Sequence, residues 1–146
     1  MPMLIKAPCG FALREYIPVT EESFTAFWAE LPIRRERRYF AESGKVFCRH
    51  PYWIEDAIKK PSRRDWQAIL ERLNSDSDES SILDNFAAEI SSGLEGYWSV
   101  DFMLGPHGWL LIDMAVGEES WHPSDCPKRR IDAPSEVAPE SEVGPG

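Results

Sequence analysis

The sequence predicts an α+β fold, in which a mainly antiparallel sheet of about five or six strands carries helices on one face. Two apolar segments flank a tight turn within residues 97–115, and an arginine-rich segment and its return strand flank a glycine-containing loop within residues 35–50, so both stretches predict β-hairpins. Two stretches with apolar side chains at helical spacing, residues 63–73 and 82–91, lie between these hairpins. Because hairpins pair their strands antiparallel, the helices that connect them are expected to cover a face of the sheet.

The composition predicts one folded domain followed by a polar tail. With 146 residues, 42% of them hydrophobic, and six tryptophans, the chain is long enough to bury one core. That core belongs to residues 1–123, whereas residues 124–146 hold four prolines and five acids and are expected to be disordered. The formal charge of −9 argues against a general nucleic-acid binder, which normally presents a basic face.

The three cysteines, Cys9, Cys48 and Cys126, predict neither disulfides nor zinc. Their number is odd and none belongs to a CxxC pair, which argues against a disulfide framework and against a structural zinc site. No apolar run has the length of a membrane span, and the N-terminal sequence MPMLIKAPCG lacks the apolar region of a signal peptide. We therefore expect a cytoplasmic protein with no membrane partner.

The segment before the first hairpin is expected to form a strand and then a helix. Residues 11–19 have the composition of a strand at a sheet edge. Thr20 is a candidate helix N-cap. Three aromatic residues follow it at helical spacing: Phe24, Phe27 and Trp28. The helix is expected to end before Pro32, since proline cannot continue it.

The first hairpin joins strands at residues 35–40 and 45–50. Its loop is expected to be Glu42-Ser43-Gly44, with glycine where a positive φ is needed. Alternation of side chains puts Glu36, Arg38 and Phe40 on one face. On the residues alone, the arginines of this strand are typical of a solvated, salt-bridged edge.

Two helices are expected between the hairpins. The first spans residues 63–73, with Ser62 as candidate N-cap and an apolar stripe that ends at Leu73. An acidic, polar loop at residues 74–81 separates it from the second helix, at residues 82–91. Both helices are amphipathic and are expected to pack on the sheet.

Each strand of the second hairpin carries an aspartate between apolar neighbours. The strands span residues 97–104 and 109–115. Asp101 and Asp113 lie at comparable distances from the turn, so if the strands pair through this short loop the two carboxylates can share one face. Such carboxylates raise each other's pKa unless a cation lies between them, and hard oxygen ligands suit Mg2+ or Mn2+. The alternative for each aspartate is a solvent-facing position without a ligand.

Five short motifs occur in order along the chain: REYI (residues 14–17), ERRYF (36–40), SGKV (43–46), SVDF (99–102) and DMA (113–115). A glycine, Gly117, follows the last of them. In this order the motifs resemble the C-terminal part of an ATP-grasp fold. That superfamily includes carboxylate–amine ligases and a phage-associated RNA-ligase-like clade. Its members show a hinge, an E-x-R strand with a following glycine turn, and a hairpin with one acid on each strand.

The resemblance implies a nucleotide site. Tyr16 and Ile17 would lie at the hinge beside the adenine, with Glu15 nearby. Glu36 and Arg38 would belong to the same site, with the Arg38 guanidinium facing the phosphates, for which its planar fork is suited.

The resemblance also implies the chemistry. Asp101 and Asp113 would hold the magnesium ions that bridge the phosphates of ATP. Together with Arg38 they would be the catalytic groups that activate a carboxylate as an acyl phosphate, which an amine then attacks. Phosphoryl transfer depends on divalent ions and cationic clamps more than on a protein nucleophile.

Two departures from the family pattern leave three interpretations open. Asp113 and Ala115 stand where the family has Glu and Asn, and the chain begins close to the hinge, so we do not expect a whole conventional ATP-grasp enzyme. The chain is a half-enzyme completed by another chain or a second copy, or a non-catalytic module for a protein or nucleotide partner, or an α+β domain with an accidental likeness. In the second interpretation, exposed tryptophan surface is the interaction site.

Ser120 and His122 follow the second hairpin and put a hydroxyl and an imidazole just past Asp113. They are candidates to line the same cleft. A surface or packing position is the alternative for His122, since that is the commoner role of a lone histidine.

Overall fold

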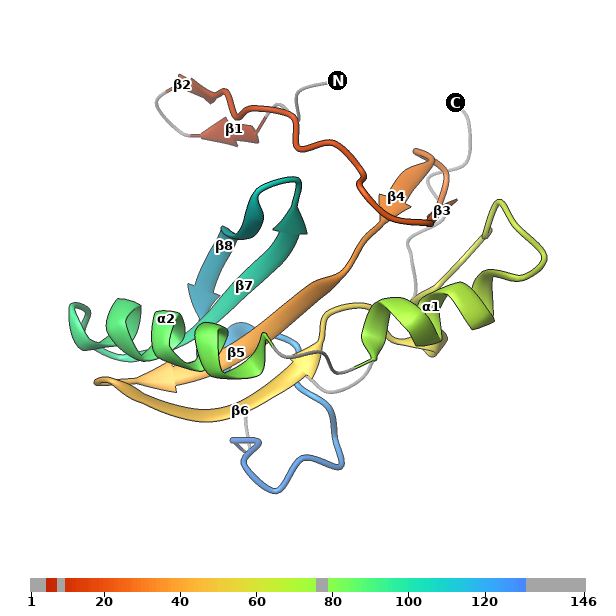
Figure 1. Ribbon diagram of the computed structural model, residues 1–146. Coiled ribbons are helices and arrows are strands. Elements are labelled where there is room, and N and C mark those ends of the chain that lie inside the picture. The colour runs from red at the N-terminus through yellow and green to blue at the C-terminus, as the bar shows by residue number, and fades with distance from the viewer. Residues whose placement is uncertain (1–4, 8–9, 76–78, 131–146) are drawn as a thin grey trace.

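A four-stranded antiparallel sheet with the strand order β6-β5-β7-β8 is the largest element of the computed structural model, which describes residues 5–7, 10–75 and 79–130 (Figure 1). Its strands are β5 (Glu36–Glu42), β6 (Lys45–Pro51), β7 (Tyr97–Gly105) and β8 (Gly108–Val116). Two helices, α1 (Trp66–Asn74) and α2 (Ser80–Ser92), lie between the two hairpins along the chain. The α+β class and the antiparallel pairing are thus confirmed.

The remaining described strands form two separate two-stranded sheets, so the strands do not make one sheet of five or six. These are β1 (Ile5–Ala7) with β2 (Gly10–Ala12), and β3 (Phe24–Ala26) with β4 (Leu31–Ile33). Two short 3-10 helices, Glu55–Ala57 and Gly117–Glu119, complete the described elements. None of the helices in this part of the chain is long and apolar enough to cross a membrane.

Both predicted hairpins of the main sheet form, with tighter turns than expected. Glu42 pairs with Lys45, so the first loop contains two residues, and both Ser43 (φ 49°) and Gly44 (φ 82°) adopt the positive φ that such a turn requires. Gly105 likewise pairs with Gly108 at the end of the second hairpin.

The helix expected after Thr20 is wrong, because β3, a tight turn and β4 occupy that segment. Phe24 pairs with Ile33 across this small sheet, and both side chains are buried. The extended conformation is fixed by backbone hydrogen bonds to a distant segment: Phe27 donates to the Lys59 carbonyl (2.7 Å), and Thr25 accepts from Ser62 (2.8 Å). These tertiary bonds override the helical spacing of the aromatic residues.

Two smaller expectations in the first half of the chain are also corrected. The strand expected over residues 11–19 is limited to β2, which ends at Ala12. Ser62 does not cap α1, since its hydroxyl accepts the Thr25 N–H (2.9 Å) and the helix begins after Asp65. The Ser62 hydroxyl thus makes a tertiary hydrogen bond to β3 instead of a local bond that caps the helix.

The two faces of the main sheet are covered by different parts of the chain. On the helical face, α2 packs Leu83 and Ala87 on Tyr39, Val100 and Phe102. A second core forms where α1 meets β3 and β4, with Ile69 and Leu73 packed beside Phe24 and Ile33. The expectation that helices pack on one sheet face therefore holds for α2, whereas α1 belongs to the second core.

The opposite face of the main sheet, called here the polar face, carries Arg38, His50, Cys48, Ser99 and Asp101. It is covered by residues 117–130, the blue segment that lies across the sheet from α2 in Figure 1. Ser120 bonds Ser99 (2.7 Å between the two Oγ atoms) and Arg130 pairs with Glu42 (2.7 Å). Packed chain therefore continues past the boundary expected at residue 123, and residues 131–146 of the expected tail lie outside the described residues.

Candidate functional site

One row of side chains crosses all four strands of the main sheet on the polar face. Arg38 on β5 is the register partner of His50 on β6 and of Asp101 on β7, and Asp101 in turn faces Asp113 on β8. Register partners project to the same face. The structure therefore brings together the three residues that the sequence placed at the catalytic and metal positions, and it adds His50 to them.

The centre of this row is a buried bidentate ion pair between Arg38 and Asp101. Nε of the guanidinium donates to Oδ1 of the carboxylate (2.8 Å) and Nη2 donates to Oδ2 (2.7 Å), and only 3% of the Asp101 side chain is exposed. The Tyr52 ring lies 4.8 Å from Cζ of Arg38, and Nη1 donates to the Trp121 carbonyl (3.3 Å). The guanidinium is thus held in one orientation by partners on several sides.

The electrostatics of Asp101 are those of a carboxylate in a crowded acidic site. Burial raises its pKa, the Arg38 guanidinium works in the opposite direction, and the nearby Asp113 charge raises the pKa further. Asp113 itself is exposed, and its Oδ1 accepts the backbone N–H of Met114 (2.9 Å). A cation beside these two acids would relieve their repulsion, so the donor set fits Mg2+, which binds through one or two carboxylates and keeps several waters.

Glu36 lies on the same face and is buried, with 8% of its surface exposed. Burial is the main reason that the pKa of Glu36 is raised to about 7, and the nearby Asp101 charge raises it too. Trp53, Arg34 and Arg38 lower it in part. Near neutral pH this carboxyl therefore exchanges its proton while it stays inside the folded protein.

We expect the stability of the protein to fall as the pH rises through the range in which Glu36 ionises. Between about pH 4.5 and 7 the Glu36 carboxyl stays protonated in the folded chain but ionises in the unfolded chain, because its pKa is raised only in the folded chain. The free energy of unfolding is therefore highest below about pH 4.5 and falls as the pH approaches 7. The loss is on the order of 3 kcal/mol over that interval. Urea unfolding at several pH values should show a correspondingly smaller loss in Glu36→Gln.

The matched control for this measurement is Glu89→Gln, because Glu89 is an exposed acid on α2. It should leave the pH dependence of the wild-type protein unchanged. Identical pH profiles for Glu36→Gln and the wild-type protein would show that Glu36 does not titrate in this interval.

The hinge residues predicted from the motif REYI lie beside the second hairpin, away from the Arg38 row. The Ile17 carbonyl accepts from Arg34, and its side chain lies near Gly105 in the turn of β7 and β8. Tyr16 is 53% exposed, with Cζ of Arg34 5.4 Å from its ring, and Glu15 is exposed. Within the described part of the chain, the contacts of Tyr16 and Ile17 are thus with Arg34 and with the hairpin turn.

A second cluster on the polar face was missed by the sequence reasoning. Cys48, His50, His122 and Cys126 place one ligand atom each within 4.8 Å of all the others. Nε2 of His122 is 3.1 Å from Sγ of Cys48 and 3.2 Å from Nε2 of His50. The sequence signal was the pair of short spacings Cys48-x-His50 and His122-x3-Cys126, which a search for CxxC pairs does not detect.

Burial disfavours the charged forms of Cys48 and His122 in this cluster. Burial raises the pKa of the Cys48 thiol to about 12, with the neighbouring Cys126 adding to the effect. Burial and the nearby His50 lower the pKa of His122 to about 4. His122 is fully buried against Phe40, with ring centroids 4.2 Å apart, so the packing role weighed from the sequence is also present.

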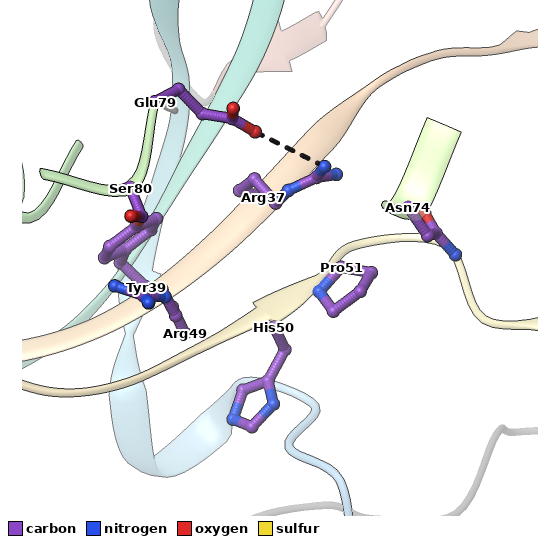
Figure 2. Close-up of a pocket in the computed structure, with 8 residues that line it drawn as sticks. All are labelled: Arg37, Tyr39, Arg49, His50, Pro51, Asn74, Glu79 and Ser80. Atoms are coloured by element: carbon purple, nitrogen blue, oxygen red, sulfur yellow. Dashed lines mark hydrogen bonds and ion pairs between the residues drawn. The ribbon is translucent and has the colours of Figure 1, made fainter. Parts of the chain in front are cut away.

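A cavity of about 250 Å³ lies beside the helical face, and of the row only His50 contributes to its lining (Figure 2). Figure 2 shows His50 projecting from β6 away from Tyr39 and Glu79, which line this cavity. Arg37 points into it but already pairs with Glu79 (3.5 Å) and donates to the Leu73 and Ser75 carbonyls. Glu79 compensates the charge of Arg37, as Asp101 compensates that of Arg38, but the lining of this cavity lacks the two neighbouring aspartates that the row offers to a cation.

Comparison with known proteins does not assign the chain to a family. No protein-family model, no curated protein and no solved structure matches it.

Proposed function

We propose that the polar face binds a Mg2+–nucleotide in an ATP-grasp-like site. The observation that carries this proposal is the single cross-strand row in which Arg38, Asp101 and Asp113 are neighbours. Asp101 and Asp113 would hold Mg2+, which supplies charge neutralisation to a polyphosphate. Arg38 supplies a planar guanidinium already oriented by Asp101, Tyr52 and the Trp121 carbonyl.

The reaction class that the resemblance implies is ATP-dependent ligation of a carboxylate to an amine. In this class the residues of the row position phosphates and compensate charge, and none of them acts as a nucleophile. Of the hinge residues, Ile17 lies near Gly105 in the turn of the second hairpin, which is four residues along β7 from Asp101. We therefore assign the row to the phosphates and the metal, and the hinge segment to the base.

A second candidate function is a protein-interaction module, favoured by the edge strand β8. Its described strand partner is β7, and Leu110, Leu111 and Val116 are exposed along it (43%, 47% and 43%). An exposed apolar edge strand is a template for a strand of another polypeptide. The tryptophans do not form an exposed interaction surface, since Trp28 is exposed but the other five are partly buried.

The nucleotide proposal is tested by calorimetric titration of the full chain with ATP, with Mg2+ and with EDTA. We expect binding that requires Mg2+ and that weakens at least about tenfold in Asp113→Asn, equivalent to about 1.4 kcal/mol. Asp113 is the residue of choice because it is exposed and its side chain accepts a hydrogen bond from the neighbouring Met114 N–H, so the fold should persist. Asp56→Asn, an exposed acid in the 3-10 helix Glu55–Ala57, is the matched control and should bind as the wild-type protein does.

Two outcomes would contradict the proposal. Metal-independent binding of equal strength would place the nucleotide elsewhere on the chain. Absence of binding at millimolar ATP, combined with self-association in light scattering, would instead favour the interaction module at β8.

A further inference from the structure

We propose that Cys48, His50, His122 and Cys126 bind one Zn2+ ion, which fastens residues 117–130 to the polar face of the sheet. Its four ligands do not include Arg38, Asp101 or Asp113, although one of them, His50, is the register partner of Arg38. It does not depend on the nucleotide proposal, because its ligands and its test are independent of Arg38, Asp101 and Asp113.

The first support is the convergence of the four ligand atoms. In a tetrahedral Zn2+ site the bond lengths of about 2.3 Å to sulfur and about 2.0 to 2.1 Å to nitrogen give edges of about 3.3 Å between nitrogens and about 3.6 Å between nitrogen and sulfur. The observed Nε2 to Nε2 distance between His50 and His122 is 3.2 Å, and Cys48 Sγ lies 3.1 Å from His122 Nε2. Small adjustments of the side chains therefore suffice to place an ion among them.

The second support is the way in which the fold supplies the ligands. Cys48 and His50 are two residues apart on β6, so their side chains project to the same face. His122 and Cys126 come from the segment that crosses this face after the 3-10 helix Gly117–Glu119. Backbone hydrogen bonding within that segment, from Cys126 N–H to the Pro123 carbonyl (3.2 Å), holds its two ligands in one compact turn.

The chemistry of the donor set selects the metal. Two thiolates and two imidazoles in tetrahedral arrangement are typical of Zn2+. A two-iron cluster with cysteine on one iron and histidine on the other would keep sulfur and nitrogen ligands apart. Contact between Cys48 Sγ and His122 Nε2 (3.1 Å) favours a single ion.

The position of the cluster indicates a structural role. Four protein ligands leave no coordination position for water or substrate, which is the feature that separates structural from catalytic zinc sites. The ion would join β6 to the segment that carries Trp121, whose carbonyl accepts from Arg38 (3.3 Å). Zinc binding would thus fix the cover of the polar face beside the Arg38 row.

The experiment uses the purified full chain without a histidine tag. We expect elemental analysis to find about one zinc per chain, and Co2+ added to the metal-free protein to give the intense visible bands of tetrahedral cobalt with a thiolate charge-transfer band. Cys126→Ser should remove the metal from the purified protein and weaken Zn2+ binding more than about 100-fold, since even changes outside the ligand shell cost about 10- to 100-fold. The matched control is His107→Gln, an exposed histidine in the turn of the second hairpin, which should retain the metal.

The spectrum of the wild-type protein decides the case even where a ligand variant fails to fold. Octahedral cobalt bands, or no stoichiometric metal in a folded wild-type protein, would overturn the proposal. A disulfide between Cys48 and Cys126, found by mass spectrometry in the metal-free protein as purified under reducing conditions, would overturn it as well. Unchanged zinc content in Cys126→Ser would exclude this ligand set.

Discussion

Asp101→Ala is expected to lower the free energy of unfolding by about 3 to 5 kcal/mol. This is the usual loss when one partner of a buried ion pair is removed, because the other charge stays buried and unpaired. Here the remaining charge is Arg38, whose side chain is 14% exposed and whose hydrogen bonds to Asp101 measure 2.7 and 2.8 Å. Chemical denaturation at pH 7.5, without metal or nucleotide, measures the change.

The chain offers a matched control in a second arginine–aspartate pair. Arg49 on β6 meets Asp84 on α2 at 2.9 Å, but the two side chains are 44% and 39% exposed. Asp84→Ala should therefore cost only about 0 to 1 kcal/mol. Equal losses for the two variants would show that the Arg38 pair is solvated and does not organise the polar face.

The double variant Arg38→Met with Asp101→Leu removes both charges, so it measures the contribution of the ion pair without leaving an unpaired buried charge. Apolar residues of similar volume often replace a buried pair with little loss of stability. We expect the double variant to be more stable than Asp101→Ala. Because Asp101 contributes to stability in this way, its substitution cannot report on nucleotide binding alone, and the binding test uses Asp113.

The parts of the fold that the sequence predicts well are governed by local chemistry. Residues 105–108 and the pair Ser43 and Gly44 specify turns, and each turn sets the register of the strands beside it. Counting from the turn of the second hairpin pairs Asp101 with Ile112, however, and the register shift between Asp101 and Phe102 is what brings Asp101 opposite Asp113. The chemical role of that pair is a separate question, which the titration with ATP and Mg2+ addresses.

The pairing of Arg38 with Asp101 could not be predicted in the same way. It depends on how β5 meets β7, two strands from different hairpins whose paired residues lie 63 positions apart. No turn connects these strands, so no local signal sets their register. The sequence therefore assigned Arg38 to phosphates or to a solvated edge, whereas the folded chain bonds it to an acid.

The Cys/His cluster was missed for a related reason. Cysteine spacing rules count ligands that are near each other in the sequence. His50 and His122 are 72 positions apart, and each contributes with one nearby cysteine. Each half alone is an unremarkable pair, and only the crossing of residues 117–130 over β6 brings the halves together.

Gly117→Ala is expected to lower the free energy of unfolding by about 1 to 3 kcal/mol, the range found for overpacked interiors. A Cβ at this position would lie 2.6 Å from Cε1 and 2.9 Å from Cγ of Tyr97, and closer still to Cδ1. The Tyr97 ring cannot move away easily. Phe40 stacks on it at 5.7 Å, and Cζ of Arg130 lies 3.6 Å from its centroid. Gly93→Ala is the control, because its Cβ would meet only the Ile90 carbonyl at 3.8 Å.

The same substitution connects the fold to the proposed zinc site. Gly117 is where the chain leaves β8 and turns over the polar face, so displacement of this turn moves His122 and Cys126 away from Cys48 and His50. We expect Gly117→Ala to weaken Zn2+ binding as well as to lower stability, and excess Zn2+ to restore part of the lost stability by mass action. Competition with a chromogenic chelator measures the first effect, and thermal unfolding with and without Zn2+ measures the second. A large loss of stability with unchanged zinc affinity would show that Gly117 anchors the chain independently of the ligands that follow it.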